Sequence, residues 1–198
     1  MLYEVFKTAI GPMGVVVREA DGVRRLASVR VGHPSLSAAE AAILERFPDA
    51  VPAKGLEATE LLTNYARTGV ADFSSLVLDD DRASRFDRAV RRACRLIPFG
   101  TTVTYADLAA MAGARRNSAR AVGGVMRRNS CPIIVPCHRV VPAGKSWALG
   151  NYSAPQGPAL KRRLLELEGF GRTESPRKAS GRRTPTRGFE VASSSRDE

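Results

Sequence analysis

Valine-rich apolar segments separated by turn residues open the chain and predict β-strands. The segments span residues 2–8, 13–19 and 23–31, and short runs of this composition are typical of strands. Asp21-Gly22 stands before the third segment, where a two-residue hairpin turn favours this dipeptide. The opening residues therefore predict an antiparallel sheet.

Two helices are expected after these strands. The sequence Ser-Ala-Ala-Glu at residues 37–40 has the form of a capping box and predicts a helix that continues through Phe47. A second helix is expected over residues 57–68, ending at Gly69. This part of the chain predicts a small α+β layer without a catalytic constellation. It contains a single histidine, His33, which cannot form a metal site alone and is expected at the surface.

Apolar residues recur at helical spacing after the α+β layer and predict a helix over residues 82–96. The buried stripe of this helix would be Phe86, Val90, Ala93 and Ile97. Pro98-Phe99-Gly100 then ends the pattern, because proline cannot continue a helix.

A pair of short helices is predicted next. Thr104 can cap a first helix, whose apolar residues lead to Gly113, and Asn117 can cap a second helix over residues 118–128. Short helices joined by a tight turn form a helix-turn-helix pattern.

The second helix of the pair presents an unusual outer side. Arg120, Gly123, Gly124 and Arg127 follow one another at spacings that place them on one face. Each glycine costs about 1 kcal/mol relative to alanine in a helix, so a close partner is expected. A nucleic-acid groove fits the two arginines, whereas close packing against another helix of the protein is the alternative.

The net charge of +11 is unevenly distributed. Residues 1–81 carry 8 basic and 12 acidic side chains, whereas residues 82–128 carry 11 basic and 2 acidic ones. A basic half joined to an acidic half predicts a surface for a polyanion, and nucleic acid is the obvious candidate. A basic face that is merely solvated remains the alternative.

Cysteine usage and hydropathy favour a cytoplasmic protein. Three cysteines are an odd number, which argues against a disulfide framework and for a reducing compartment. We expect no membrane span and no signal peptide. Residues 171–198 are rich in Arg, Ser, Thr and Pro, and we expect them to form a disordered basic tail.

The strongest chemical signal is the pair Cys137-His138, which follows the apolar run 131–135 and Pro136. A thiol is nucleophilic as thiolate, and a neighbouring imidazole can take its proton. Neighbours in an extended strand point to opposite faces. The pair therefore requires either a sharp turn at Pro136 or a bridging water. A cysteine that is simply part of the core is the competing interpretation.

Near the end of the predicted catalytic region, one helix face combines apolar residues with Lys161 and Glu168. A carboxylate beside apolar residues needs a partner. His138 would supply one, and a surface ion pair with Lys161 is the alternative.

In their order and spacing, these motifs resemble the O6-alkylguanine-DNA alkyltransferases, also called methylated-DNA–protein-cysteine methyltransferases. The resemblance covers residues 86–169. It rests on the segments Ile97–Gly100, Thr104-Tyr105, Ala119–Gly124, Asn129, Pro132–Val140, Gly150–Ser153 and Leu164–Gly169.

The resemblance implies that Cys137 accepts the alkyl group from O6 of guanine, irreversibly and once per molecule. The damaged nucleotide would first be flipped out of the duplex. His138 would act on Cys137 through a water, Glu168 would orient His138, and Asn129 would brace the active-site turn.

The resemblance also assigns residues that contact DNA. The second helix of the pair would enter the minor groove, where the small residues Gly123 and Gly124 allow close approach. Arg120 would fill the vacated stack, Tyr105 would lie beside the phosphate of the flipped nucleotide, and Arg127 would join the same surface. The implied guanine pocket comprises backbone atoms of Cys137, Val140 and Ser153, together with Tyr152, Lys161 and Pro132.

The implied fold is a ribonuclease-H-like α+β layer over residues 1–80, then a mostly helical, winged-helix-like DNA-binding and catalytic domain over residues 81–170, followed by the tail 171–198. The implied partner is double-stranded DNA containing O6-alkylguanine, with O4-alkylthymine as a further candidate. We expect a nucleoid-associated monomer without cofactor. No metal is expected, because the zinc-binding cysteines and histidine pair of some family members are missing here.

Three segments depart from the family pattern. The turn around Arg115, residues 113–117, is one residue longer, and the loop 141–150, which holds the single tryptophan Trp147, is also longer. Trp147 would be either a hydrophobic cover or a substrate contact. Residues 154–157 replace a more glycine-rich stretch, which bears on the size of alkyl group that the pocket accepts.

Two other classes of function compete with alkyl transfer. A non-reactive damage-binding protein of the alkyltransferase-like kind would lack the reactive cysteine, which is present as Cys137. A cysteine hydrolase would use Cys137 and His138, but no oxyanion-hole glycine motif precedes the cysteine, and the basic helix pair would have no role.

Overall fold

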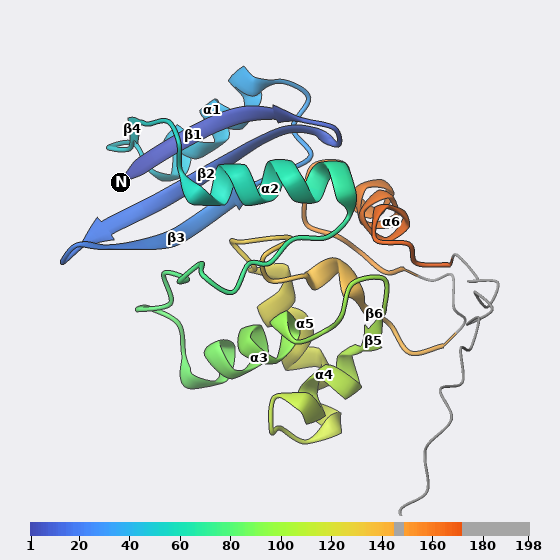
Figure 1. Ribbon diagram of the computed structural model, residues 1–198. Coiled ribbons are helices and arrows are strands. Elements are labelled where there is room, and N and C mark those ends of the chain that lie inside the picture. Colours follow the sequence, from blue (N-terminus) through green and yellow to red (C-terminus); the bar gives the residue numbers. More distant parts are fainter. Residues whose placement is uncertain (145–148, 172–198) are drawn as a thin grey trace, which may run out of the picture.

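A four-stranded sheet forms one end of the molecule (Figure 1). The computed structural model describes residues 1–144 and 149–171. The strands of the sheet are β1 (Leu2–Thr8), β2 (Gly11–Ala20), β3 (Val23–Arg30) and β4 (Val51–Pro52), in the spatial order β3-β2-β1-β4. β1 and β3 pair antiparallel with β2, and β4 pairs parallel with β1. The predicted antiparallel arrangement of the first strands is confirmed, with Asp21 and Gly22 in the left-handed turn between β2 and β3.

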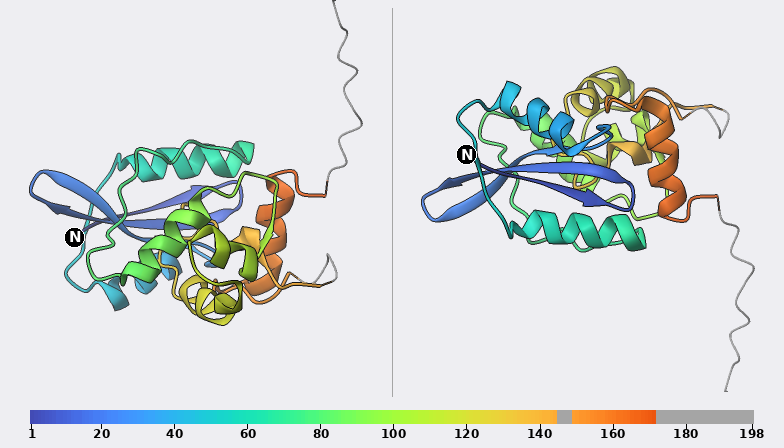
Figure 2. Two further views of the ribbon diagram at one scale, coloured as in Figure 1. Left: turned by 90° about the horizontal axis from the view of Figure 1, so that it is seen from below. Right: turned by 90° about the horizontal axis from the view of Figure 1, so that it is seen from above.

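Helices α1 (Leu36–Arg46) and α2 (Glu57–Thr68) cover opposite faces of this sheet (Figure 2). Alternation along β2 explains the arrangement, because successive side chains point to opposite faces. Val16 packs in one cluster with Ile43 of α1, whereas Val15 packs with Leu62 of α2. The α+β layer predicted from the sequence is therefore present.

The second half of the chain is mainly helical and lies beside this layer (Figure 1). Its elements are α3 (Arg85–Arg95), β5 (Val103–Thr104), α4 (Tyr105–Met111), α5 (Ala119–Arg127), β6 (Val140–Val141) and α6 (Gly157–Leu167). Short 3₁₀ turns occupy Arg116–Ser118 and Cys137–Arg139. β5 and β6 pair in parallel.

Two predicted helix starts are wrong by a few residues. The helix expected to be capped at Ser37 begins earlier, because the side chain of Ser35 accepts a hydrogen bond from the backbone N–H of Ala38. The helix expected from Arg82 begins later, after Ser84, whose side chain caps Asp87 in the same way. At the first of these helices, Ser35 offered the same capping chemistry as the predicted cap Ser37, and at the second no cap had been predicted.

The helix pair is confirmed, but only one of its predicted caps is. Thr104 forms a full capping box with Asp107 at the start of α4. Asn117, predicted to cap α5, instead lies in a 3₁₀ turn, and α5 has no side-chain cap. A 3₁₀ turn that leads directly into a helix brings the chain into the helix without a capping side chain.

The active-site segment, residues 131–140, lies where two hydrophobic cores meet. Ile133 and Ile134 pack with the α2 face of the sheet and with α6. Val135, Cys137 and Val140 pack with α3, α4 and α5 instead. The segment is therefore anchored on both sides, which restricts where the thiol can point.

No helix within the described residues is long and apolar enough to cross a membrane. The predictions for Trp147 and for the basic tail concern residues outside the described ranges.

Candidate active site around Cys137

The chain turns sharply immediately before Cys137. Pro136 has φ −78° and ψ 63°, the conformation of an inverse γ-turn. The backbone N–H of Cys137 accordingly donates to the carbonyl of Val135 at 2.8 Å, and Cys137–Arg139 form a 3₁₀ turn. The sequence left open a sharp turn or a bridging water. The turn is present, and no direct hydrogen bond joins the side chains of Cys137 and His138.

A strained residue shapes the approach to this turn. Ile133 has φ 73°, a region that β-branched residues strongly avoid. The backbone N–H of Val135 closes the loop by donating to the carbonyl of Cys131 at 2.9 Å. Ile133 is almost completely buried in the core, so its side-chain packing offsets the backbone strain.

Asn129 ties the turn to the thiol. Its Nδ2 donates to the carbonyl of Val135 at 2.8 Å and to Sγ of Cys137 at 3.1 Å. Its Oδ1 accepts from the backbone N–H of Cys131 at 3.1 Å. These bonds agree with the bracing role that the family resemblance implies for Asn129.

Burial keeps the thiol protonated in the free protein. It raises the pKa of Cys137, while the hydrogen bond from Asn129 and the charge of Lys161 act in the opposite direction. Nζ of Lys161 is fully buried and donates to the carbonyl of Val140 at 2.6 Å, and burial lowers the pKa of Lys161 to about 8. A nearby cation that favours the thiolate is therefore built into the site.

His138 is held by Glu168. Nε2 of His138 lies 2.7 Å from Oε1 of Glu168, and both side chains are fully buried. Burial lowers the pKa of His138, which makes the neutral ring the resting form. Because an ionised carboxylate only accepts, Nε2 carries the proton and Nδ1 is the free base. Nδ1 is buried and has no hydrogen-bond partner among the described residues.

Glu168 does not pair with Lys161, so the predicted surface alternative is wrong. Burial alone raises the pKa of the Glu168 carboxyl, but hydrogen bonds from His138 and Arg139 outweigh this effect and lower the pKa to about 2. Arg139 donates from Nε to Oε2 and from Nη2 to Oε1, each at 2.9 Å. The carboxylate is therefore ionised and fixed at two points.

Sequence reasoning missed three contributors to this network. They are Arg139, the hydroxyl of Tyr65, which donates to Oε1 of Glu168 at 2.7 Å, and the backbone N–H of Gly100, which donates to Oε2 at 3.3 Å. Arg139 directly follows the Cys-His pair, and its position was a usable signal. Tyr65 belongs to α2, in the part of the chain where no catalytic constellation was expected, and nothing in its sequence context marked it.

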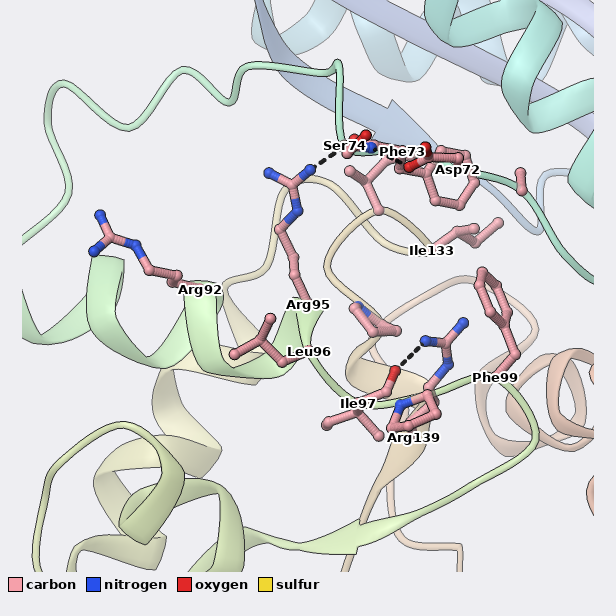
Figure 3. A pocket seen from close by; sticks show the side chains of 14 residues that line it. Asp72, Phe73, Ser74, Arg92, Arg95, Leu96, Ile97, Phe99, Ile133 and Arg139 are labelled. Atoms are coloured by element: carbon pink, nitrogen blue, oxygen red, sulfur yellow. Dashed lines mark hydrogen bonds between the residues drawn. The ribbon is translucent and has the colours of Figure 1, made fainter. Parts of the chain in front are cut away.

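Figure 3 shows the cavity behind the active-site turn. It has a volume of about 490 Å³ and is lined by residues of α3, of the segment 71–74 and of the active-site segment. Arg139 reaches into its wall, where Nη1 donates to the carbonyl of Ile97 at 2.5 Å and the guanidinium lies 4.1 Å from the ring centroid of Phe99. The contacts with Ile97 and Phe99 thus hold the guanidinium of Arg139, whose Nε and Nη2 donate to Glu168.

A different cavity is lined both by Cys137 and by residues of the helix pair, α4 and α5. Its volume is about 330 Å³. The lining residues are Tyr105, Gly123, Met126, Arg127, Cys137, Asn151, Tyr152 and Ser153. Most of them were assigned from the sequence to DNA contact or to the guanine pocket, and the structure brings them together around Cys137.

A smaller cavity of about 90 Å³ reaches Cys137 from the side of the sheet. Asn129, Pro132 and Tyr152 line it, and so does His33. The side chain of His33 is only partly buried, which is compatible with the expected surface position, and it lines a cavity that Cys137 lines as well.

The outer side of α5 is free of close protein neighbours. A Cβ built on Gly123 would meet only Tyr105, at 3.9 Å, and one on Gly124 only the end of the Arg128 side chain, at 3.3 Å. Internal helix packing, the alternative left by the sequence, therefore does not require these glycines. Arg120 and Arg127 are exposed beside them and form no ion pair with the described residues.

Residues 85–170 match the family model described as the 6-O-methylguanine DNA methyltransferase DNA-binding domain. Over 179 residues the chain is 33% identical to the methylated-DNA–protein-cysteine methyltransferase of Mus musculus, covering 86% of this chain and 82% of the mouse protein. The chain belongs to this family. The Homo sapiens member is 51% identical over 75 residues, 38% of this chain and 34% of the human protein.

Solved structures of the methyltransferase family share this fold. Mycobacterium tuberculosis OGT in complex with DNA superposes with a TM-score of 0.64 at 31% identity, covering 85% of this chain and 93% of that chain. The O6-methylguanine-DNA methyltransferase of Pyrococcus kodakaraensis gives a TM-score of 0.60 at 26% identity, covering 85% and 98%. The mixed sheet and helices described above agree with these α+β structures.

Proposed function

We propose that this methyltransferase-family chain repairs DNA by transferring the alkyl group of O6-alkylguanine to its own Cys137. The observation that carries the proposal is the position of the thiol. Cys137 lines the same cavity as Tyr105, Gly123 and Arg127 of the helix pair. A base flipped out of a duplex that is bound on α5 would enter from this side.

In the proposed reaction, Sγ of Cys137 attacks the alkyl carbon in line with O6. The S–C bond forms as the C–O bond breaks, and the bonding pair leaves with O6. The thiol proton passes to Nδ1 of His138 through a bridging water and ends on N1 of the released guanine, so that atoms and charge balance. The thioether is stable, which makes each molecule act once.

The surrounding residues assist the attack electrostatically. The amide of Asn129 donates to Sγ, and the charge of Lys161 favours the thiolate. Glu168 would stabilise the imidazolium that His138 becomes when it receives the proton. Each of these groups acts where negative or positive charge develops during the reaction.

On the DNA side, α5 would lie in the minor groove of a double-stranded substrate. Gly123 and Gly124 permit close approach, and the exposed Arg127 would contact phosphate. Arg120 would take the position of the extruded nucleotide in the stack, and Tyr105 would hold its phosphate. Flipping costs a few kcal/mol of stacking and pairing, which these contacts would offset.

The guanine itself would be read by backbone groups near the thiol. We assign this role to Cys137, Val140 and Ser153, with the side chains of Tyr152 and Pro132 against the base and the alkyl group. The carbonyl of Val140 is oriented by its bond to Lys161, which leaves a lone pair for the guanine edge. O4-alkylthymine remains a second candidate substrate.

We also propose the finer organisation of the fold. Residues 1–80 would form a ribonuclease-H-like layer, and residues 81–170 a winged-helix-like DNA-binding and catalytic domain. The basic residues 171–198 would add nonspecific affinity for DNA.

Mass spectrometry after incubation with a duplex that contains one O6-methylguanine tests the proposal. We expect one methyl group per molecule, located on Cys137. Cys137→Ala should abolish transfer and retain duplex binding. Cys131→Ala is the matched control, because Cys131 is also a buried free thiol, and it should transfer normally. Methylation that persists in Cys137→Ala would refute the assignment.

A further inference from the structure

We propose that Tyr65, a residue of the α+β layer, is a positioning residue of the alkyl-transfer site that sets the proton affinity of His138 through Glu168. The proposal rests on alkyl transfer to Cys137 as the proposed function. It adds a contribution from outside residues 85–170, the region that the family model matches.

The contact between Tyr65 and the network is direct and buried. The ring of Tyr65 is completely buried, and its hydroxyl lies 2.7 Å from Oε1 of Glu168. The same oxygen binds Nε2 of His138 at 2.7 Å. Because the carboxylate is ionised and can only accept, the phenol is the donor. The hydroxyl and the imidazole therefore share one oxygen atom.

Tertiary packing fixes the hydroxyl in this place. The C-terminal end of α2 abuts the end of α6, where a Cβ on Gly69 would stand 2.2 Å from the carbonyl oxygen of Leu167. The ring of Tyr65 neighbours the rings of Phe73 and Phe99, with centroid distances of 6.0 and 6.2 Å. A side chain enclosed in this way loses little further freedom when it donates.

The shared oxygen couples Tyr65 to the chemistry. A donor on Oε1 draws away part of the negative charge that would stabilise protonated His138. The charged and titratable groups around the imidazole ring of His138 are Cys137, Arg139, Lys161 and Glu168. Tyr65 faces the carboxylate of Glu168, and Tyr152 faces the thiol of Cys137. Among them, Tyr65 can be altered by deleting a single oxygen atom without changing any charge.

The test is Tyr65→Phe, which keeps the ring. Neutral His138 has to accept the thiol proton, so a more basic ring moves the acid limb of the pH–rate profile to higher pH. We expect NMR titration of the free protein to show the pKa of His138 raised by about 0.5 unit or more. The chain has 2 histidines, which makes the signal simple to assign. On the acid limb of the profile, transfer from O6-methylguanine in a duplex should slow by about threefold, the factor that corresponds to a shift of 0.5 unit.

Tyr3→Phe is the matched control. Tyr3 is a buried tyrosine of the same layer, and its hydroxyl donates to Glu40 at 2.6 Å, away from the network. Neither the titration of His138 nor the transfer rate should change. An unmoved titration and an unmoved acid limb in Tyr65→Phe would overturn the proposal, even if stability fell. The titration needs no substrate, so a wild-type protein that transferred nothing would refute the proposed function and leave this coupling to be judged by NMR.

Discussion

Nζ of Lys161 donates to the carbonyl of Val140 at 2.6 Å inside a fully buried site. Helix α6 and the strand after the active-site turn are joined by this bond. The ammonium also lies close enough to Cys137 to oppose the rise in its pKa. One buried lysine thus holds a backbone group of the proposed guanine pocket and supplies positive charge for the thiolate.

Stability should depend on pH through Lys161. Burial lowers its pKa from 10.5 to about 8 in the folded protein. Below about pH 8 both states hold the proton and the full cost of the buried charge is present. Between about pH 8 and 10.5 the unfolded state binds more protons, so folding stability rises with pH.

Urea unfolding of wild type and Lys161→Met across pH 6 to 10.5 measures this effect. The stability of wild type relative to the variant should be constant below about pH 7 and then increase by at most about 3 kcal/mol. A relative stability that stays flat through the alkaline range would contradict the titration assigned to Lys161.

Asn129→Asp should slow alkyl transfer more than Asn129→Ala. Both variants lose the hydrogen bond from Nδ2 to Sγ of Cys137, which removes support for the thiolate. The aspartate also places a like charge beside it. We expect losses of about tenfold for alanine and about a hundredfold for aspartate at neutral pH.

Rates of methyl transfer by wild type and both variants, measured from pH 6 to 9, test whether the aspartate variant is slower than the alanine variant. Equal rates in the two variants would show that the charge beside the thiol does not limit the reaction. Asn151→Ala is a useful control, because Asn151 lines the cavity without bonding the thiol.

Gly69→Ala should disrupt the contact between Tyr65 of α2 and Glu168 at the end of α6. Gly69 has φ 79°, and its added Cβ would stand 2.2 Å from the carbonyl oxygen of Leu167. The ends of α2 and α6 would have to move apart, taking Tyr65 away from Glu168. We expect a loss of about 3 kcal/mol in unfolding free energy and slower transfer.

Gly55→Ala is the control for backbone strain alone. Gly55 has φ 70° with no atom within 4 Å of the built Cβ, so about 1–2 kcal/mol and unchanged transfer are expected. Similar losses of stability in the two variants would mean that the clash with Leu167 relaxes without consequence.

Arg120→Ala should impair repair of duplex DNA and spare the free base. Arg120 is exposed on α5 and forms no ion pair with the described residues, so we expect the chemistry itself to be untouched. We predict at least tenfold slower methyl transfer from a duplex and an unchanged rate from free O6-methylguanine.

Arg162→Ala removes an exposed cation from α6 and controls for net charge. This variant should bind duplex DNA slightly more weakly, and to the same extent for every DNA sequence. If Arg120→Ala slowed both substrates alike, a role in nucleotide flipping would be refuted.

Most predictions of helices and strands came from local sequence patterns. Valine-rich runs with Asp21-Gly22, the Gly69 stop and the Thr104 cap are read within a few neighbouring residues, and the structure contains each of them. Predictions were wrong where several residues offered the same local chemistry, as Ser35 and Ser37 did. The motif around Cys137 likewise indicated the candidate nucleophile, because thiol, imidazole and proline constraint stand together in sequence.

Sequence alone thus determined the strands, the helix pair, the candidate nucleophile and the family resemblance, all of which depend on short-range spacing. Tertiary structure decided which cavities reach Cys137, that His33 lines one of them, and that Glu168 binds Arg139 rather than Lys161. It also decided that Tyr65 meets Glu168, a contact between residues 103 positions apart. Such contacts follow from how α2 and α6 pack, and packing depends on the shape of the whole core rather than on any local pattern.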